Sequence, residues 1–187
     1  VFYASEFRYS PPPLLPNTLT IGVTQSGETA DTIAAIDMEI KRRSSKEDKK
    51  FTPNLIAITN RKESSIGRQV LNIIDICAGI EVGVAATKTF FGQLLSFYGL
   101  AIKFAQIKGT QSSDEIDKLI TELIKLPPLI EDLLEQHNES SEKLAHDFFN
   151  IKDVIFLGRG INYPIALEGA LKLKEISYIH AAGYPAG

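Results

Sequence analysis

The chain has 187 residues, 44% of them hydrophobic, which is enough for one to one and a half domains with a buried core. Its formal net charge is -3 with acids and bases interspersed, so we expect neither nucleic acid nor a membrane surface as a partner. A single cysteine excludes a disulfide framework, and the three histidines show no metal-ligand spacing, so we predict no metal and no cofactor.

No segment has the composition of a membrane span or of a signal peptide. The longest apolar stretch, Leu94 to Ala105, is interrupted by Ser96 and Lys103 and is shorter than the ~20 residues that a span needs. The N-terminus lacks the basic, apolar and small-residue order of a signal peptide. We therefore expect a cytoplasmic protein.

Short apolar strands alternate with helices in the first part of the chain. Runs rich in β-branched residues predict strands at 19–23, 55–59 and 73–77, the last with Cys77 as a small buried residue. Apolar residues at three- and four-residue steps predict a helix over 29–41, and a helical turn is expected near 66–70. Parallel strands need crossover connections, usually helices, so the alternation predicts an α/β fold with a doubly wound parallel sheet flanked by helices.

A helical layer follows, and then the strand pattern restarts. Strand 154–157, the turn Gly158-Arg159-Gly160 and a helix over 164–178 resemble the earlier strand, loop and helix, which indicates an imperfect internal duplication. We expect residues 1–138 to form a first lobe with the helical layer, and residues 139–187 a linking helix and the start of a second lobe. The layer itself is predicted as helices at 87–107, 113–124, 129–135 and 141–149, with a break at Pro127-Pro128.

Ten mostly charged residues, Lys41 to Lys50, lie between the predicted helix and the second strand. Basic runs of this kind can bind nucleic acid. Here acidic residues interrupt the run and no aromatic residues are interleaved to stack on bases. We interpret the segment as a solvated loop.

The turn Thr24-Gln25-Ser26-Gly27-Glu28-Thr29 joins a strand end to a helix start. Hydroxyls and free backbone amides at the positive end of a helix can bind a phosphate without a lysine. Capping of the helix by Ser or Thr explains the same residues without a ligand. Glu28 counts against a phosphate site unless its carboxylate points away from the anion. The residues by themselves leave both interpretations open.

Glu168, Lys172 and Glu175 follow one another at four- and three-residue steps, which places them on one face of the last helix. The spacing alone favours a surface ladder of ion pairs. A carboxylate with a neighbouring cation is also what proton transfer between two carbons requires, because the base moves the proton and the cation stabilises the enediolate.

Four strings together resemble the isomerase half of the glutamine–fructose-6-phosphate aminotransferase family, which is of the sugar isomerase (SIS) type. The resemblance spans nearly the whole chain, in residues 4–9, 24–32, 78–88 and 156–180. It implies the SIS fold, as one nearly complete lobe plus the start of a second. It also implies sugar-phosphate binding, synthesis of glucosamine 6-phosphate from fructose 6-phosphate and glutamine for amino-sugar and UDP-N-acetylglucosamine production, and a homodimer of the full-length parent.

The resemblance also implies roles for individual residues. The sugar phosphate would be held by four residues of the turn: Thr24, Gln25, Ser26 and Thr29. The backbone around Val84 would line the sugar. Glu175 would carry the proton, and Lys172 would assist it. The helix face of Glu168 to Glu175 therefore becomes a candidate catalytic site within this resemblance.

The chain also departs from the pattern of the family. Thr24 and Ala86 stand where Ser is usual, Ala182 and Gly183 stand where Glu and Ala are usual, and the charged loop is longer. The opening βα unit of the first lobe, the glutaminase domain, the ring-opening His segment and the C-terminal Lys are absent, so we expect this fragment alone to be inactive. Two alternatives stay open: another SIS phosphosugar isomerase or deglycase, and a noncatalytic sugar-phosphate-binding regulator. The Lys172/Glu175 pair favours an enzyme.

Overall fold

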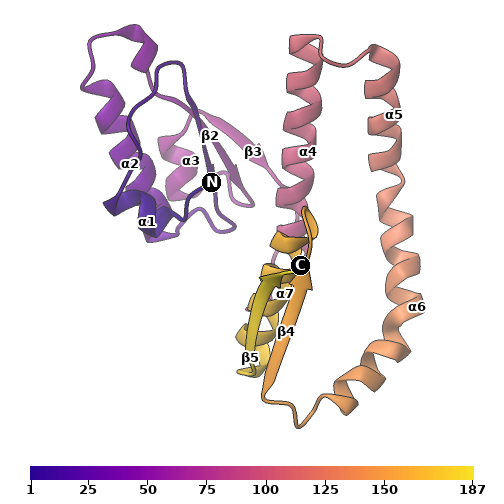
Figure 1. Cartoon of the computed structure of the whole chain (residues 1–187). Coiled ribbons are helices and arrows are strands. Elements are labelled where there is room, and N and C mark those ends of the chain that lie inside the picture. The colour runs from indigo at the N-terminus through magenta and orange to yellow at the C-terminus, as the bar shows by residue number, and fades with distance from the viewer. The chain divides into compact units, whose positions relative to one another are not determined.

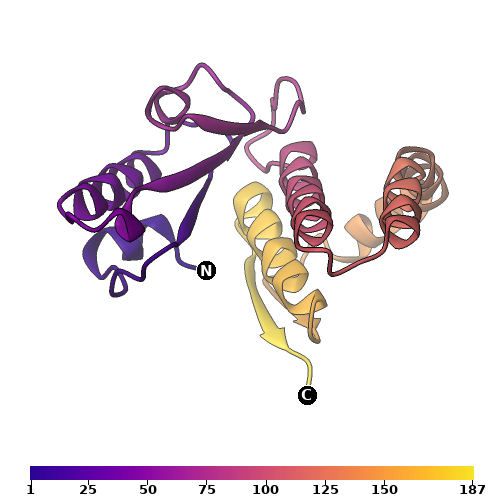
Figure 2. The ribbon, with the colours of Figure 1, turned by 90° about the horizontal axis from the view of Figure 1, so that it is seen from above.

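The computed structural model describes residues 1–187 and divides into two compact units, traced in Figures 1 and 2. The first unit comprises Val1–Glu81 and Thr87–Leu100, and the second comprises Val82–Ala86 and Ala101–Gly187. Each unit has its own sheet, and every strand pair in both sheets is parallel. The predicted α/β class with a parallel sheet flanked by helices is confirmed.

The elements follow one another in the order that the apolar pattern predicts, with α1, η1 and β5 in addition. In chain order they are α1 (Ala4–Tyr9), β1 (Leu19–Val23), α2 (Ala30–Ser44), η1 (Lys49–Phe51), β2 (Asn54–Thr59), α3 (Ser65–Gln69), β3 (Asn72–Asp75), α4 (Lys88–Lys108), α5 (Ser113–Ile124), α6 (Leu126–Asp147), β4 (Asp153–Gly158), α7 (Asn162–Ser177) and β5 (His180–Pro185).

The core of the first unit lies between its sheet and two helices. The sheet has the order β1-β2-β3, and Gly22 of β1 pairs with Ala57 of β2. Ile36 of α2 and Ile66 and Val70 at α3 form one buried cluster with Ala57. A Cβ at Gly22 would lie 2.7 Å from Ile36 Cδ1, so the glycine lets α2 pack directly on the sheet. This packing sets the position of the loop that joins β1 to α2.

The carboxyl end of α2 is not a solvated loop, which corrects the interpretation of the charged segment. Arg43 is buried, its Nε lies 2.7 Å from Glu39 Oε1, and its guanidinium also donates to the carbonyl of Leu15 at 3.1 Å. The neighbouring Arg42 donates to the carbonyl of Pro12 at 2.8 Å. The two arginines thus bind the proline-rich segment before β1 to α2, whereas Lys41, Ser44 and the residues that follow the helix up to Lys50 are exposed.

In the second unit, α7 packs closely on the β4–β5 pair. Ala166 and Ala170 of α7 and Ala181 of β5 are buried. A Cβ at Gly183 would lie 3.0 Å from the backbone N and Cα of Leu167, so the helix backbone nearly touches the strand at this point. The glycine that departs from the family pattern therefore has a local structural reason.

Two further predictions are wrong. The helical layer is interrupted at Lys125, beside the predicted break, but the two helices expected at 129–135 and 141–149 are one helix, α6, which runs unbroken to Asp147 with Pro127 and Pro128 in its first turn. Proline is tolerated there because the first-turn amides have no intrahelical acceptor. Cys77 is exposed rather than buried: β3 ends at Asp75, whose carboxylate accepts the amide of Cys77 at 2.9 Å, and the chain turns with a φ of 51° at the cysteine.

No helix of the chain is both long and apolar enough to cross a membrane.

Candidate active site

The loop of residues 24–29 leaves the carboxyl end of β1 and enters α2, as the sequence predicts. Its two threonine hydroxyls converge, because the Oγ1 atoms of Thr24 and Thr29 lie 3.0 Å apart. The amide of Gly27 donates to Thr24 Oγ1 at 3.2 Å, and the loop thereby folds into a tight turn. Ser26 Oγ accepts the amide of Glu28 at 3.1 Å. The predicted hydroxyls thus belong to one turn.

The start of α2 offers unused donors beside these hydroxyls. Thr29 is the N-cap residue, yet its side chain makes no capping hydrogen bond, and the first helical amide bond runs from Ile33 to the carbonyl of Thr29. The amides of residues 30–32 therefore have no acceptor within the chain, at the positive end of the helix dipole. This arrangement favours the anion interpretation of the loop over simple capping.

Gly27 is required by the packing beneath the loop. Its φ is +67°, and a Cβ there would lie 1.9 Å from Ser64 Oγ and 3.2 Å from Thr59 Oγ1. Ser64 and Thr59 are both buried, so neither can move aside into solvent. A left-handed conformation with no space for a side chain admits glycine alone.

The segment from β2 to α3 holds the loop from below through its backbone. The carbonyl of Gln25 accepts the amide of Asn60 at 3.1 Å and the hydroxyl of Thr59 at 3.4 Å. The carbonyl of Gly27 accepts the amide of Ile66 at 3.1 Å. Gln25, predicted as a phosphate ligand, is therefore fixed by its carbonyl, while its side chain makes no hydrogen bond within the chain.

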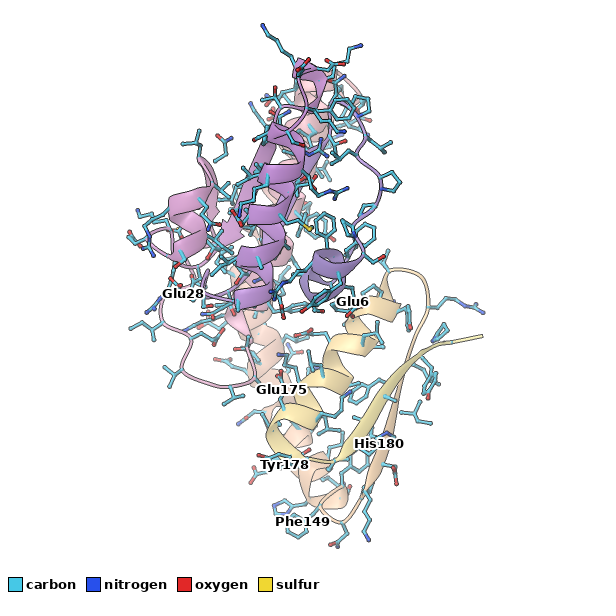
Figure 3. The ribbon with its side chains drawn as sticks, turned by 90° about the vertical axis from the view of Figure 1, so that its left-hand side faces the viewer. Glu6, Glu28, Phe149, Glu175, Tyr178 and His180 are labelled. Atoms are coloured by element: carbon cyan, nitrogen blue, oxygen red, sulfur yellow. The ribbon has the colours of Figure 1, made fainter.

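Two acidic residues, Glu28 in the loop and Asp31 just after it, both bind partners of their own. Both carboxylate oxygens of Glu28, labelled in Figure 3, accept from Ser65: Oε1 from the amide at 2.8 Å and Oε2 from the hydroxyl at 2.7 Å. Asp31, in the first turn of α2, pairs with Arg8 of α1 at 3.3 Å. The charges that would repel an anion are thus engaged away from the hydroxyls.

The hydrogen bonds from Ser65 also hold the pKa of Glu28 below its ordinary value of 4.5. The side-chain bond contributes most and the backbone bond next; slight burial opposes them, and the charges of Arg68 and Arg61 add to the lowering. Glu28 is therefore ionised throughout the neutral range, and only its direction keeps it compatible with a bound anion.

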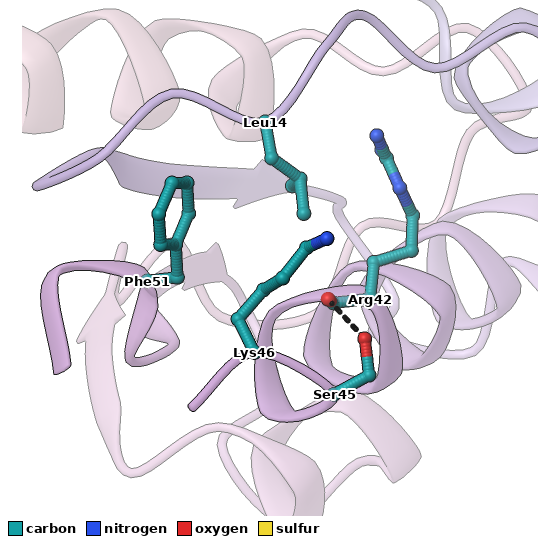
Figure 4. Close-up of a pocket in the computed structure, with 5 residues that line it drawn as sticks. All are labelled: Leu14, Arg42, Ser45, Lys46 and Phe51. Carbon is teal, nitrogen blue, oxygen red and sulfur yellow. Dashed lines mark hydrogen bonds between the residues drawn. The ribbon is translucent and has the colours of Figure 1, made fainter. Parts of the chain in front are cut away.

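Two hollows mark the surface of the first unit. The smaller, of about 290 Å³, is lined by Glu28, Arg61, Glu63 and Ser64 and adjoins the loop. The larger, of about 470 Å³, is shown in Figure 4 and is lined by Leu14, Arg42, Ser45, Lys46 and Phe51. It lies at the carboxyl end of α2, roughly 20 Å along the helix from the loop at 1.5 Å per residue. That separation excludes the larger hollow from the phosphate site.

The segment that contains Val84 is closed at its base by Glu81. One carboxylate oxygen, Oε2, accepts from the amides of Thr87 and Thr89 at 3.3 and 3.1 Å and from the Thr89 hydroxyl at 2.7 Å. The hydroxyl and amide of Thr89 lower the pKa of Glu81 most, and slight burial opposes them. Val84 itself is 85% exposed, and its backbone makes no hydrogen bond within the chain.

Three charged residues of α7, Glu168, Lys172 and Glu175, form one cluster. The ammonium of Lys172 lies 3.3 Å from Glu168 Oε1 and 3.0 Å from Glu175 Oε2. The three side chains are 24%, 24% and 30% exposed, whereas the surface pair Lys125–Glu122 is 55% and 68% exposed. Partial burial therefore distinguishes this cluster from a solvated ladder. Glu175 is labelled in Figure 3.

The surroundings of Lys172 act on its pKa in both directions. Burial is the largest single contribution and favours the neutral amine. The hydrogen bonds and charges of Glu175 and Glu168 together outweigh it, so the pKa of Lys172 is raised above its ordinary value of 10.5. Lys172 is therefore a cation at neutral pH, and it lies next to the side chain of Glu175.

The amino-acid sequence matches the SIS domain family over residues 1–103 and 147–187, which cover both the loop and the cluster on α7. This chain belongs to the SIS domain family.

Individual relatives of this SIS domain chain are long enzymes. Over all 187 residues it is 60% identical to glutamine–fructose-6-phosphate aminotransferase (isomerizing) of Thermosynechococcus vestitus, and over 98% of its length it is 47% identical to that of Methanosarcina mazei. It spans 30% and 28% of these two relatives. Among solved structures, the C-terminal domain of glucosamine-fructose-6-phosphate aminotransferase from Francisella tularensis matches 97% of the chain and 49% of its own, with a TM-score of 0.88 and 37% identity.

Two further residues, Asn60 and Ser64, shape this SIS domain site through contacts that the sequence does not predict. Asn60 accepts the amide of Ala78 at 3.0 Å and donates to the carbonyl of Gly79 at 2.6 Å, which ties the end of β2 to the segment before Glu81. Ser64 caps α3 by accepting the amide of Gly67. A serine before a short helix is a recognisable N-cap pattern, but the contact of Ser64 with Gly27 depends on chain folding.

Proposed function

We propose that this chain is the sugar-phosphate-binding and isomerising part of an enzyme that makes glucosamine 6-phosphate from fructose 6-phosphate and glutamine. The observation that carries the proposal is the loop of residues 24–29, where the Thr24 and Thr29 hydroxyls converge beside free helix amides while the carboxylates of Glu28 and Asp31 are engaged elsewhere. The relatives that match along the whole chain bear the name of this enzyme.

The chemistry assigned to the chain starts with the phosphate. A dianionic phosphate gains from the amides at the start of α2 and from the hydroxyls of Thr24, Ser26 and Thr29. Phosphate binding fixes one end of the sugar, and we propose that the backbone near Val84 lines the remainder. Orientation of this kind is what permits a proton to move between defined carbons of a flexible sugar.

The isomerisation step is assigned to the cluster on α7. The carboxylate of Glu175 removes a proton from one of the two carbons, C1 or C2, and returns it to the other, so that aldose and ketose interconvert through an enediolate. The ammonium of Lys172, a cation at neutral pH, stabilises the negative charge on the oxygen of that intermediate.

The chain spans about 30% of the length of its curated relatives, so the supply of nitrogen from glutamine is proposed for the whole protein rather than for these residues. The division into lobes at residues 138 and 139, the homodimer and the cytoplasmic location stay predictions.

The test of the phosphate site is replacement of its hydroxyls. The double variant Ser26→Ala/Thr29→Ala should bind glucose 6-phosphate or fructose 6-phosphate more weakly by about 1–3 kcal/mol, the range for hydrogen bonds to a charged group. Titration calorimetry measures the change. The matched control is Ser45→Ala/Thr52→Ala, which removes two exposed hydroxyls of the same unit and should leave the affinity unchanged. Equal affinity of the loop variant and the wild type would refute the assignment.

A further inference from the structure

Glu28 has a distinct place in the candidate phosphate loop. It lies between two proposed ligands, Ser26 and Thr29, yet both of its oxygens bind Ser65 on a different element, 37 residues later. Ser65 Oγ also accepts from Arg68 at 2.9 Å, and Arg68 in turn donates to the carbonyl of Glu63. The carboxylate is therefore the first member of a chain of hydrogen bonds that runs into α3.

We propose that Glu28 is a positioning residue for sugar-phosphate binding, because its bond to Ser65 anchors the loop to α3 and keeps its own charge directed away from the phosphate. The proposal rests on the proposed function of the loop. It concerns the orientation of Ser26 and Thr29, and Glu28 itself touches no ligand.

The geometry of the bond explains why the side chain serves as an anchor. The carboxylate receives two hydrogen bonds from the same residue, one on each oxygen, so its rotation is fixed in two directions. The backbone of the loop is fixed nearby at Gly27, whose carbonyl accepts the amide of Ile66. Together the two contacts attach the second half of the loop to the start of α3, next to the donors that a phosphate would use.

If Glu28 did not anchor the loop, its neutralisation would change the affinity for anions in the opposite direction. If Glu28 acted on a phosphate only through its charge, its neutralisation would remove a repulsion, and anions would bind more tightly. If it acts as an anchor, its neutralisation releases the loop, and anions bind more weakly. The sign of the change therefore separates the two possibilities.

The experiment measures binding of glucose 6-phosphate and of inorganic phosphate to the full chain by titration calorimetry. Glu28→Gln and Ser65→Ala should each weaken binding, by about three- to tenfold for one charge-assisted hydrogen bond at an exposed site. Because both act on one contact, the double variant should be no weaker than the weaker single variant. Ser65→Thr, which keeps the hydroxyl, should restore the wild-type affinity. Glu63→Gln, which neutralises an acid of the same hollow, should leave the affinity unchanged.

Each result has one meaning. Absence of binding by the wild type overturns the proposed function of the loop. Binding by the wild type with unchanged or tighter binding by Glu28→Gln overturns the anchor alone, and so do additive effects of the two single variants. If Glu28→Gln fails to fold, the comparison of Ser65→Ala with Ser65→Thr decides the question, because a loss of affinity that the threonine does not restore also contradicts the anchor.

Discussion

The two units of the chain contain the same run of a strand, a loop, a helix and a parallel strand, but they place their polar chemistry differently. In β1–α2–β2 the hydroxyls stand in the loop, and the charges of α2 hold other parts of the chain. In β4–α7–β5 the loop contains one basic residue, Arg159, which donates to the carbonyl of Ala186. The ionisable cluster of this unit lies on the face of α7 instead. One backbone plan thus carries either a hydroxyl-rich turn or a charged helix face.

The glycines of the two loops show how differently the loops are supported. Gly27 and Gly160 both have positive φ values, +67° and +56°. A Cβ at Gly27 would overlap the buried Ser64, whereas a Cβ at Gly160 would meet no atom within 4 Å. The first loop is therefore packed at its glycine against a neighbouring element, whereas the second is open at Gly160. We infer that the first loop must keep one shape, as a phosphate site requires.

The largest effect is expected when each glycine is replaced by alanine. Gly160→Ala should lower the free energy of unfolding by about 1–2 kcal/mol for the left-handed conformation alone. Gly27→Ala should lower it by about 3–5 kcal/mol, because overpacking adds to the same conformational term. Urea denaturation of both variants measures the difference. Equal losses at the two positions would mean that the first loop is no better supported than the second.

A second prediction compares how much the buried ion pair of α2 and the cluster of α7 contribute to the free energy of unfolding. Arg43→Met should lower the free energy of unfolding by about 3 kcal/mol, because it leaves Glu39 buried with only the weaker contact of Arg42 at 3.3 Å. Lys172→Met should lower it by about 1 kcal/mol or less, because its partners are partly solvated.

The effects of the two substitutions on sugar-phosphate isomerisation should have the reverse order to their effects on stability. Proton exchange at the sugar carbons should be lost in Lys172→Met. It should be retained in Arg43→Met when that variant is assayed below its melting temperature. Denaturation curves and solvent-deuterium incorporation, both measured on the enzyme that contains this chain, check the two halves. A Lys172→Met enzyme that exchanges at the wild-type rate would return the cluster to a structural role.

The smallest of the expected effects is the change of local stability with pH. The pKa of Glu81 is lowered, so its closure of the segment 82–86 contributes fully above pH 4.5 and is lost as the pH falls through the lower value in the folded chain. The pKa of Lys172 is raised, so the cluster contributes fully below pH 10.5 and is lost as the pH rises through the higher folded value. Acid should therefore loosen the Glu81 segment, and alkali should loosen α7.

Amide hydrogen exchange checks this order when each wild-type site is compared with its own variant at the same pH. Protection of residues 87–89 should differ between the wild type and Glu81→Gln above pH 4.5, and the difference should shrink below it. A difference that persists unchanged in acid would show that the carboxylate is not what closes the segment.

The local sequence pattern was sufficient to predict a helix or strand whose ends are set by its own residues. The bounds of β1 and α5 agree with the prediction, the first because β-branched residues end at polar ones, the second because Ser112 and Glu115 form a capping box. β5 was not predicted, since His-Ala-Ala-Gly-Tyr-Pro has few strand-favouring residues and becomes a strand by pairing with β4. Cys77 was misplaced for a different reason: the turn at its position depends on a local hydrogen bond from its amide to the side chain of Asp75, which a pattern of apolar residues does not reveal.

For the candidate site, the residue types of the loop were enough to name a strand end, a run of hydroxyls and a helix start, because all three depend on neighbours within a few positions. They were not enough to decide whether an anion is tolerated there. That question depends on where Glu28 and Asp31 point, and their partners, Ser65 and Arg8, lie 37 and 23 residues away in the chain. Only the packing of α1 against α2, and of the α3 start beneath the loop, brings those partners within hydrogen-bonding distance and directs the two charges away from the hydroxyls.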